Sequence, residues 1–413
     1  MAERNPVATA DQEWVEREAL KLTQHPEIKK TFAEVRDHWL KLAEPSPDQR
    51  RIFDTYFPEV MFCAAVWSLN QDPQRPRVTC ITRLPHKLGD LDIPGSRYGL
   101  DNPDTVYRII PIAGDERYVI KGKVGKNRLT ENYFTLWDPV MNTVDVLDGK
   151  KLQTDADGNF EITVNSEPHN GRTNHVQSSP KAHEFYIRDV LLDWSKDDLN
   201  ELSIVKEGPP KTPPRSLEEQ VELTRKFMWN YANSTHRWNL QALKKEPNQF
   251  QFTIDRDTDG ALRNQIYILG QYKLEKDEAL IINLRSGGAE YFTVPVTNVW
   301  GCTMNIINGT GCLNKWSSVA NPDGTYTFVV SQTDPGVHNW VDTSGTGDGI
   351  ITLRWAEFPG GRAGPDVGAD SKVVKLSELK SALPAGTKWV TAAERKAQIE
   401  TRAKAYMRRL GQN

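Results

Sequence analysis

The feature that most constrains the fold of this 413-residue chain is an internal duplication. Four landmarks of the first half recur in the second half at offsets of 158, 166, 165 and 166 residues. They are YFTL at 133–136 and YFTV at 291–294, DGNFEITV at 157–164 and DGTYTFVV at 323–330, Asn174 and Asn339, and Arg188 and Arg354. The near-constant offset predicts two copies of one domain.

Both copies consist of short runs rich in Val, Ile, Tyr and Phe, separated by Gly, Pro, Asn and Asp, which is the pattern of strands and turns. Such blocks close into sandwiches, jelly rolls or barrels because strand edges must be hidden. We therefore expect a mainly β fold with flanking helices and two duplicated jelly-roll or sandwich-like β domains. Residues shared by both copies are expected to serve the common fold. Residues found in one copy are better functional candidates.

The domain boundaries follow from changes in this pattern. EGPPKTPPRS at 207–216 contains four prolines and predicts a stiff linker, and Ser216 with Glu219 forms a capping box that starts a helix. We expect an N-terminal helical segment at 1–75, a first β domain at 76–206, a linker at 207–215, interdomain helices at 216–248, a second β domain at 249–358, and a tail with a terminal helix at 359–413.

Composition limits the classes of partner. The net charge of −3 gives no general attraction to nucleic acid or anionic lipid, and no apolar run is long enough for a membrane span or a signal peptide. We expect a cytoplasmic protein without nucleic-acid or membrane partners. The four cysteines are scattered without a CxxC pair, and no phosphate-binding or dinucleotide-binding glycine motif is present, so we expect no cofactor.

The second β block resembles the bacterial family known as domain of unknown function 1214, over about residues 250–357. The residues that match its motifs are Asn298, Trp300, Asp334, Pro335, Gly336, Asn339, Trp340, Asp342, Thr343 and Arg354. Upstream, Asn102, Pro103, Asp104 and Tyr107 resemble the domain that commonly precedes it. The resemblance implies a tandem jelly-roll architecture and no particular reaction. Val341 replaces the family's usual leucine.

The loop DPGVHNWVDTSG at 334–345 is the first candidate site. Asp334 and Asp342 are candidate acid/base carboxylates, with His338 as proton shuttle and Trp340 as a stacking platform for a ring. The alternative is structural, because Asp-Pro-Gly is a strong turn former and Asp and Asn side chains bind loop amides.

A second candidate lies at 102–108. Asp104, Tyr107 and Arg108 are candidate acid, hydroxyl donor and anion clamp, although the Asn-Pro-Asp turn explains the first of these residues without any function. Trp300 is a candidate for stacking on a substrate at an interdomain seam. His169, His175 and His183 fit no metal-binding motif, so we expect no metal site.

These candidates predict a cofactor-independent hydrolase or lyase acting on a carbohydrate-like or alicyclic small molecule. The alternative is a non-catalytic module that binds a small-molecule or glycan-like ligand, or another protein, through the same aromatic surfaces. A third possibility is a homo-oligomer assembled through Ile399, Tyr406 and Leu410 of the terminal helix. The enzyme hypothesis requires His338 and an aspartate to converge in a pocket.

Overall fold

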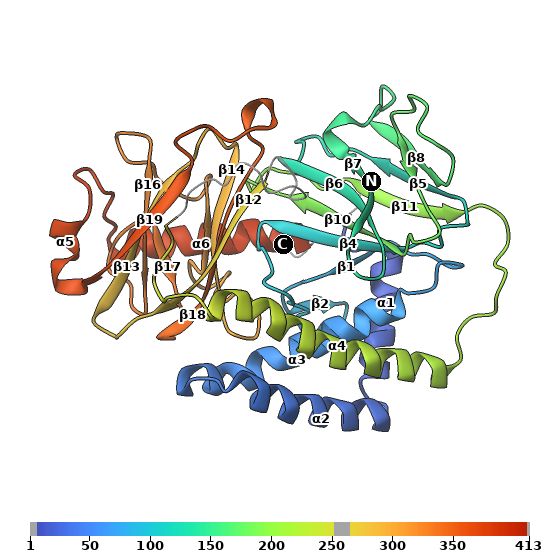
Figure 1. The fold of residues 1–413 in the computed structure, drawn as a ribbon, viewed down its shortest axis with the longest axis horizontal. Helices are drawn as coiled ribbons and strands as arrows, with labels where there is room; N and C mark the ends of the chain where they lie inside the picture. Colours follow the sequence, from blue (N-terminus) through green and yellow to red (C-terminus); the bar gives the residue numbers. More distant parts are fainter. Residues whose placement is uncertain (1–5, 252–264, 411–413) are drawn as a thin grey trace.

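Two β sandwiches lie side by side in the computed structural model, which describes residues 6–251 and 265–410. Helices α2, α3 and α4 run along one side of the pair, and α6 lies on another side (Figure 1). This arrangement confirms the predicted mainly β fold with flanking helices.

The first sandwich is built from two sheets, in the strand orders β1-β4-β10-β6-β7 and β11-β5-β8-β9. Their bounds are β1 Thr79–Ile81, β4 Thr105–Pro111, β5 Tyr118–Lys123, β6 Glu131–Trp137, β7 Thr143–Asp148, β8 Asn159–Asn165, β9 His175–Gln177, β10 Glu184–Val190 and β11 Glu201–Lys206. The small hairpin of β2 His86–Leu88 and β3 Leu91–Ile93 precedes β4.

The second sandwich repeats this topology, with the orders β12-β18-β14-β15 and β19-β13-β16-β17. Their bounds are β12 Gln265–Lys273, β13 Glu278–Arg285, β14 Tyr291–Thr297, β15 Cys312–Asn314, β16 Tyr326–Ser331, β17 Trp340–Asp342, β18 Asp348–Ala356 and β19 Gly368–Lys375. In each copy one pair of strands is parallel, β8 with β9 and β16 with β17. The shared order and the shared parallel pair identify the two sandwiches as copies of one domain.

The strand register corrects one landmark of the duplication. Val190, two residues after Arg188, lies opposite Glu131, and Ala356, two residues after Arg354, lies opposite Tyr291. Glu131 is therefore the structural counterpart of Tyr291, two residues before the tyrosine of YFTL. Because side chains alternate across a strand, this slip of two leaves each residue on its expected face.

The second β domain extends beyond the expected boundary at 358. Strand β19, from the segment that we expected to be a tail, pairs with β13 along its whole length. It occupies the place that β11 takes beside β5 in the first copy. The glycine- and proline-rich stretch before β19 concealed this strand in the sequence.

The helices include the one that the capping box at Ser216 predicts. They are α1 Ala10–Leu22, α2 Pro26–Ala43, α3 Pro47–Leu69, α4 Leu217–Leu243, α5 Leu379–Ala382 and α6 Ala392–Leu410, with short 3₁₀ turns η1 Gly149–Lys151, η2 Pro359–Gly361 and η3 Leu376–Glu378. The Ser216 hydroxyl accepts from the amide of Glu219, and the Glu219 carboxylate accepts from the amide of Ser216, which confirms the capping box. No helix of the described part of the chain is long and apolar enough to cross a membrane.

Helix α6 joins both β domains through a row of arginines spaced seven residues apart. Arg395 binds Asp334 and Arg402 donates to the carbonyl of Cys312, both in the second domain, and the Arg409 guanidinium lies 5.7 Å from the ring centroid of Trp194 in the first domain. Tyr406 is buried against Trp194 of the first domain, so it is not part of an exposed apolar patch.

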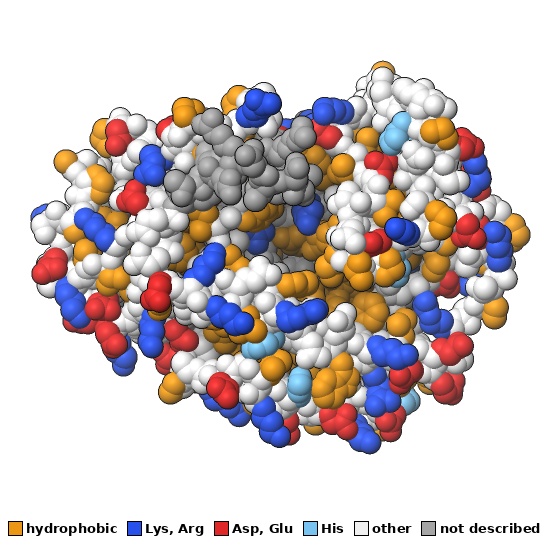
Figure 2. Space-filling model, viewed as in Figure 1, with side chains coloured by type: hydrophobic (Ala, Val, Ile, Leu, Met, Phe, Trp, Pro, Cys, Tyr) orange, Lys and Arg blue, Asp and Glu red, His pale blue; other side chains and the backbone are white. Residues whose placement is uncertain are grey.

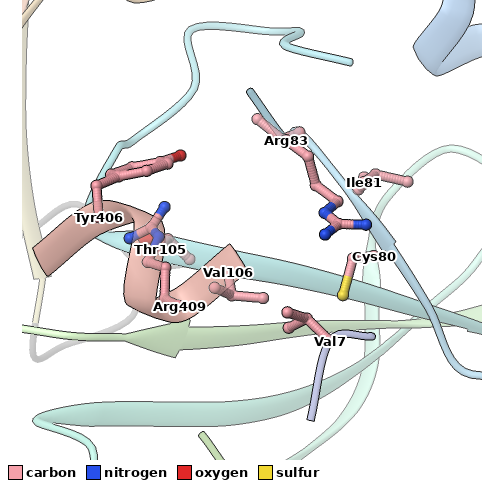
Figure 3. A pocket seen from close by; sticks show the side chains of 9 residues that line it. Val7, Cys80, Ile81, Arg83, Thr105, Val106, Tyr406 and Arg409 are labelled. Carbon is pink, nitrogen blue, oxygen red and sulfur yellow. The ribbon is translucent and has the colours of Figure 1, made fainter. Parts of the chain in front are cut away.

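A small cavity of about 10 Å³ remains where the end of α6 meets β1 and β4 (Figure 3). Arg83 and Arg409 line it, and Arg83 is paired with Glu16. Because the cavity is at most the size of one water, it belongs to the packing of α6 rather than to a ligand site.

Replacing Arg395 with alanine is expected to lower the free energy of unfolding by about 1.5–3 kcal/mol, because its hydrogen bonds involve charged groups. Its guanidinium bonds both Asp334 oxygens, at 2.9 and 3.1 Å, and the carbonyls of Val337 and His338. Chemical denaturation measures the loss, and limited proteolysis should cut α6 first. The exposed neighbour Lys396, changed to alanine, is the matched control, and equal effects of the two changes would contradict this role of Arg395.

Candidate functional site

The two aspartates of the loop at 334–345 have structural roles. Asp334 accepts from the amide of Gly336 in an Asx turn, where Gly336 has φ of 78°, and it is paired with Arg395. Asp342 accepts from Asn305 and from the amide of Ser344. Both aspartates therefore satisfy backbone and neighbouring groups, as Asp residues in turns commonly do.

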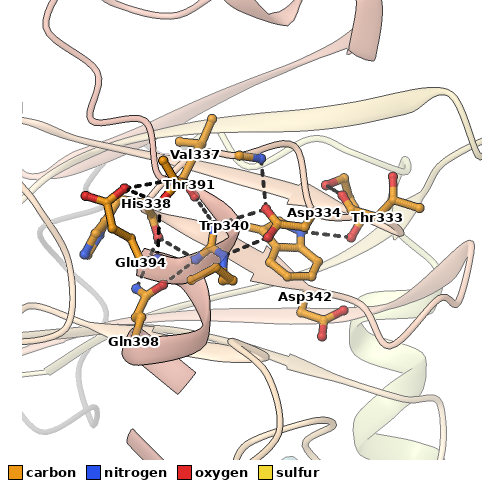
Figure 4. A network of polar contacts seen from close by, with 12 residues as sticks. Thr333, Asp334, Val337, His338, Trp340, Asp342, Thr391, Glu394 and Gln398 are labelled. Carbon is orange, nitrogen blue, oxygen red and sulfur yellow. Dashed lines mark hydrogen bonds and ion pairs between the residues drawn. The ribbon is translucent and has the colours of Figure 1, made fainter. Parts of the chain in front are cut away.

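The predicted acid/base cluster does not assemble. His338 Nδ1 lies 3.2 Å from Asn339 Oδ1, and neither Asp334 nor Asp342 is hydrogen-bonded to the imidazole. Asp342 points away from the network that joins Asp334 to α6 (Figure 4). The convergence that the enzyme hypothesis requires is thus missing at this loop.

Asn339 and Trp340 are also structural. The Asn339 amide bonds the backbone amide and carbonyl of Val319, as its counterpart Asn174 bonds those of Gln153. This confirms that the repeated asparagine serves the fold. Trp340 is buried, donates to the carbonyl of Ser331 and lies under the Arg395 guanidinium, so its ring is not available for stacking on a substrate.

His338 does line an open groove of about 430 Å³ between α6 and the second sandwich. Lys388, Glu394, Gln398 and Arg402 contribute polar groups to it. The Glu394 carboxylate accepts hydrogen bonds from the amide and the hydroxyl of Thr391 at the start of α6. Among the described residues of the groove, no carboxylate is hydrogen-bonded to the His338 imidazole.

Trp300 and Arg108 belong to the interior. Trp300 is fully buried with its ring 4.2 Å from that of Phe53, so it does not face a substrate. Arg108 is 1% exposed and forms an ion pair with Asp189, whose side chain is also buried. Arg108 is therefore a structural cation, and the expected anion clamp is not at this position.

A different cavity lies where the outer faces of sheets β4-β10-β6 and β12-β18-β14 meet. Its polar lining is contributed by both domains and consists of Asn102, Thr105, Tyr107, Glu131, Arg188, Tyr267, Tyr291 and Arg354. Of the residues that we predicted for substrate binding, Tyr107 lines it directly. We call this the interdomain cleft.

The cleft is an approximate two-fold arrangement created by the duplication. Tyr107 lies opposite Arg188 in one sheet, and Tyr267 lies opposite Arg354 in the other. Their inner-face neighbours, such as Ile187 and Leu353, belong to the two sandwich cores. Strand alternation thus turns both arginines outward, where the two domains contact each other. Glu131 and Tyr291 are an unequal pair in this arrangement, an acid in one copy and a phenol in the other.

The two arginines are not neutralised within the described residues. Neither Arg188 nor Arg354 has a carboxylate within 4.0 Å there. Arg354 donates to the carbonyl of Leu100 at 2.6 Å, while its Nε is buried without a partner. Arg188 lies over the rings of Tyr186 and Trp137, at 5.0 and 5.6 Å from their centroids. The cleft therefore has cationic groups with free capacity for an anion.

Asp104 does not line the cleft but binds Tyr291, which does. Its buried carboxylate accepts from the Tyr291 hydroxyl at 2.8 Å, from Trp194 and from Asn314. Asn102 donates to the same Tyr291 hydroxyl at 2.8 Å. Burial raises the pKa of Asp104, and burial together with Asp104 raises that of Tyr291 well above its usual value. The Tyr291 phenol is thus held neutral and in one orientation.

Aromatic rings continue the wall beyond Arg188. Tyr186 stacks on Trp137 at 4.3 Å and on Trp67 at 5.9 Å between ring centroids. Tyr107 lies 5.4 Å from Tyr186. Figure 2 shows a hollow between the two β domains, above α4, in which hydrophobic and Lys or Arg side chains are visible. This surface combines cations with flat apolar faces.

Glu131 is the unusual acid of the cleft. Its side chain is 3% exposed, and burial raises its pKa to about 7 despite the nearby Arg188. Such a group changes its charge near neutral pH, which is a property of functional sites.

Glu131 should make stability depend on pH. Because its folded pKa lies above the ordinary 4.5, the folded protein keeps a proton that the unfolded chain releases, and stability falls as pH rises from about 4.5 to about 7. With about 1.4 kcal/mol per pKa unit, replacing Glu131 with glutamine should raise the free energy of unfolding at pH 8 by about 1–3 kcal/mol. The change at pH 5 should be small. Denaturation at both pH values measures the difference, and an equal effect at both would contradict the assignment.

No group of three or more metal-binding side chains is found within 6–251 and 265–410. His169 bonds Asp145, and His175 bonds Thr163. These contacts account for two of the three histidines that lie close in sequence.

The chain is similar to solved structures of other proteins. An uncharacterised protein from Burkholderia cenocepacia aligns with 87% of this chain and 99% of its own, at 23% identity and a TM-score of 0.71. A protein from Vibrio parahaemolyticus aligns with 84% of this chain and 99% of its own, at 11% identity and a TM-score of 0.44. No family model and no curated protein matches the chain. The first likeness concerns the fold, and the resemblance to domain of unknown function 1214 stays a prediction.

Proposed function

We propose that the chain binds a small, ring-bearing organic carboxylate in the interdomain cleft. Arg188 and Arg354 hold the carboxylate, and the tyrosine and tryptophan rings contact the rest of the ligand. The observation that carries this proposal is the convergence of two arginines, one from each copy, on one cavity, where no carboxylate of the described residues, Glu131 included, lies within 4.0 Å of either guanidinium.

The charge of the cleft favours an anion. A buried or half-buried guanidinium is stable when it is paired or hydrogen-bonded, and Arg354 Nε is buried without a partner among the described residues. An anion that reaches both arginines supplies the missing acceptors. A carboxylate matches the planar fork of a guanidinium, which allows two parallel hydrogen bonds.

The size of the cavity determines which part of the ligand it can hold, the carboxylate or the ring. Its enclosed volume is about 20 Å³, enough for little more than one water. This space fits the oxygens of a carboxylate and not a ring, so the ring occupies the open part of the cleft. The stacked aromatic rings beside Arg188 provide a surface for it.

This proposal develops the ligand-binding alternative of the sequence analysis. Hydrolysis or elimination by Asp334, His338 and Asp342 has no support in their geometry, because these side chains do not converge. The ring-bearing ligand class that the aromatic residues predicted is retained, at a different place in the molecule.

The test is a calorimetric titration with benzoate, cyclohexanecarboxylate and glucuronate, each compared with a neutral or inorganic control. Benzamide keeps the ring and lacks the charge, whereas inorganic phosphate keeps the charge and lacks the ring. We expect at least one carboxylate to bind, and both controls to bind at least about tenfold more weakly, since each loses roughly 1.4 kcal/mol or more. Equal affinity for benzamide would contradict the arginine-held carboxylate.

A further inference from the structure

We propose that Glu131 contacts the bound anion in its neutral, protonated form, as a third anion-binding group beside Arg188 and Arg354. Each ligand then enters the cleft together with one proton. This inference rests on the proposed function and adds to it the way in which the site takes up charge.

The duplication shows what kind of group this position needs. In the second copy the counterpart of Glu131 is Tyr291, a neutral phenol that lines the same cavity. The Tyr291 hydroxyl donates to Asp104, so its proton is not free for an anion, whereas a protonated Glu131 carboxyl presents an O–H that can donate to one. An ionised Glu131 would instead set a second negative charge against the ligand. Because Glu131 lines the cavity together with Arg188 and Arg354, its neutral form can donate to an anion held there, and its charged form opposes binding.

The surroundings of Glu131 permit both the ionised and the protonated carboxyl. Arg188 on β10 and Arg354 on β18 favour its ionised form, while burial and the Glu357 carboxylate after β18 oppose it. Tyr267 on β12 faces it as well, with a phenol whose pKa is raised. No ion pair joins Glu131 to a residue of the described ranges, so the carboxyl is not fixed in its charged form.

A bound carboxylate changes this balance in one direction. Its negative charge offsets the attraction of the two arginines and adds repulsion toward an ionised Glu131. By linkage, the ligand raises the pKa of Glu131, and the proton in turn raises the affinity for the ligand. Affinity is then greatest below about pH 7 and decreases by up to about tenfold per pH unit above it.

The experiment is a series of titrations with benzoate, which stays ionised throughout, between about pH 5.5 and about pH 9. We expect the wild-type affinity to be constant at low pH and to fall above neutrality. At pH 8, titrations in two buffers of different ionisation enthalpy should show uptake of about one proton per benzoate. Glu131→Gln should bind benzoate with little dependence on pH and without proton uptake.

Glu161→Gln is the matched control, because Glu161 lies on the same domain and is exposed in a pair with Lys121. It should keep the wild-type pH profile. A wild-type affinity independent of pH, or a Glu131→Gln variant that keeps the proton uptake, would overturn the role of Glu131 and leave the cleft as a binding site. Absence of benzoate, cyclohexanecarboxylate and glucuronate binding at every pH would overturn the proposed function and, with it, this inference.

Discussion

Replacing Arg108 with alanine is expected to lower the free energy of unfolding by about 3–5 kcal/mol, since it leaves Asp189 as an unpaired buried charge. Arg108 and Asp189 are 1% and 0% exposed in their ion pair, and the Arg108 guanidinium also donates to the carbonyl of Asn200 at 2.7 Å. Asn132 donates to the second oxygen of Asp189. The pair therefore joins strands β4, β6 and β10 inside the first domain.

Guanidinium chloride denaturation measures this loss, and a double variant supplies the control. Replacing Arg108 with methionine and Asp189 with leucine removes both charges together, so it should cost less than either single alanine. A loss below about 1 kcal/mol for Arg108→Ala would place the residue among exposed ion pairs and contradict its structural role.

The second large effect is expected from the arginines of the cleft. Changing both Arg188 and Arg354 to alanine should weaken carboxylate binding by about 10²–10⁴-fold, because each arginine contributes charge-assisted hydrogen bonds of about 1.5–3 kcal/mol. Each single change should account for part of the loss. Titration with benzoate measures it.

Replacing the cleft arginines is expected to change the affinity for benzoate more than the free energy of unfolding. The Arg188 side chain has no hydrogen bond or ion pair among the described residues, so its loss should change the free energy of unfolding by less than about 1 kcal/mol. Arg117, an exposed arginine on the first domain that pairs with Glu167 and Glu207, is the control and should leave affinity unchanged when replaced with alanine. Wild-type affinity in the Arg188/Arg354 double variant would contradict the assignment of the cleft.

The fold could be predicted because the sequence contains two copies of the same pattern of strands and turns. The repeated Asp-Gly turn, Asn174 with Asn339, and the strand arginines marked equivalent strands, and the structure places them in equivalent sheets. The register of the YFTL and YFTV strands could not be fixed in this way, because it depends on which residues face Arg188 and Arg354 across the sheet.

The site could be predicted only in part, through Tyr107. We expected residues repeated in both copies to serve the fold, and this holds for Asn174 and Asn339. For Arg188 and Arg354 it omits that the two domains meet through their outer sheet faces, where both arginines line the cleft. Equivalent residues of the two copies therefore line the same cleft. The sequence pattern of one domain does not show which sheet faces of the two domains will contact each other.

The loop at 334–345 misled for a related reason. Its charged residues are concentrated in sequence, but Asp334 is bound by Arg395 of α6, 61 residues later, and Asp342 accepts from Asn305, which lies outside the loop. The spacing of Arg395, Arg402 and Arg409 at seven residues was the available signal that one face of this basic helix is buried.

The most direct test of the central claim is a crystal structure of the protein with 4-bromobenzoate, in which anomalous scattering locates the bromine. The cleft assignment predicts a bromine peak beside Tyr186 and Trp137, with the carboxylate between Arg188 and Arg354. A peak confined to the groove of His338, Lys388 and Arg402, with an empty cleft, would contradict it.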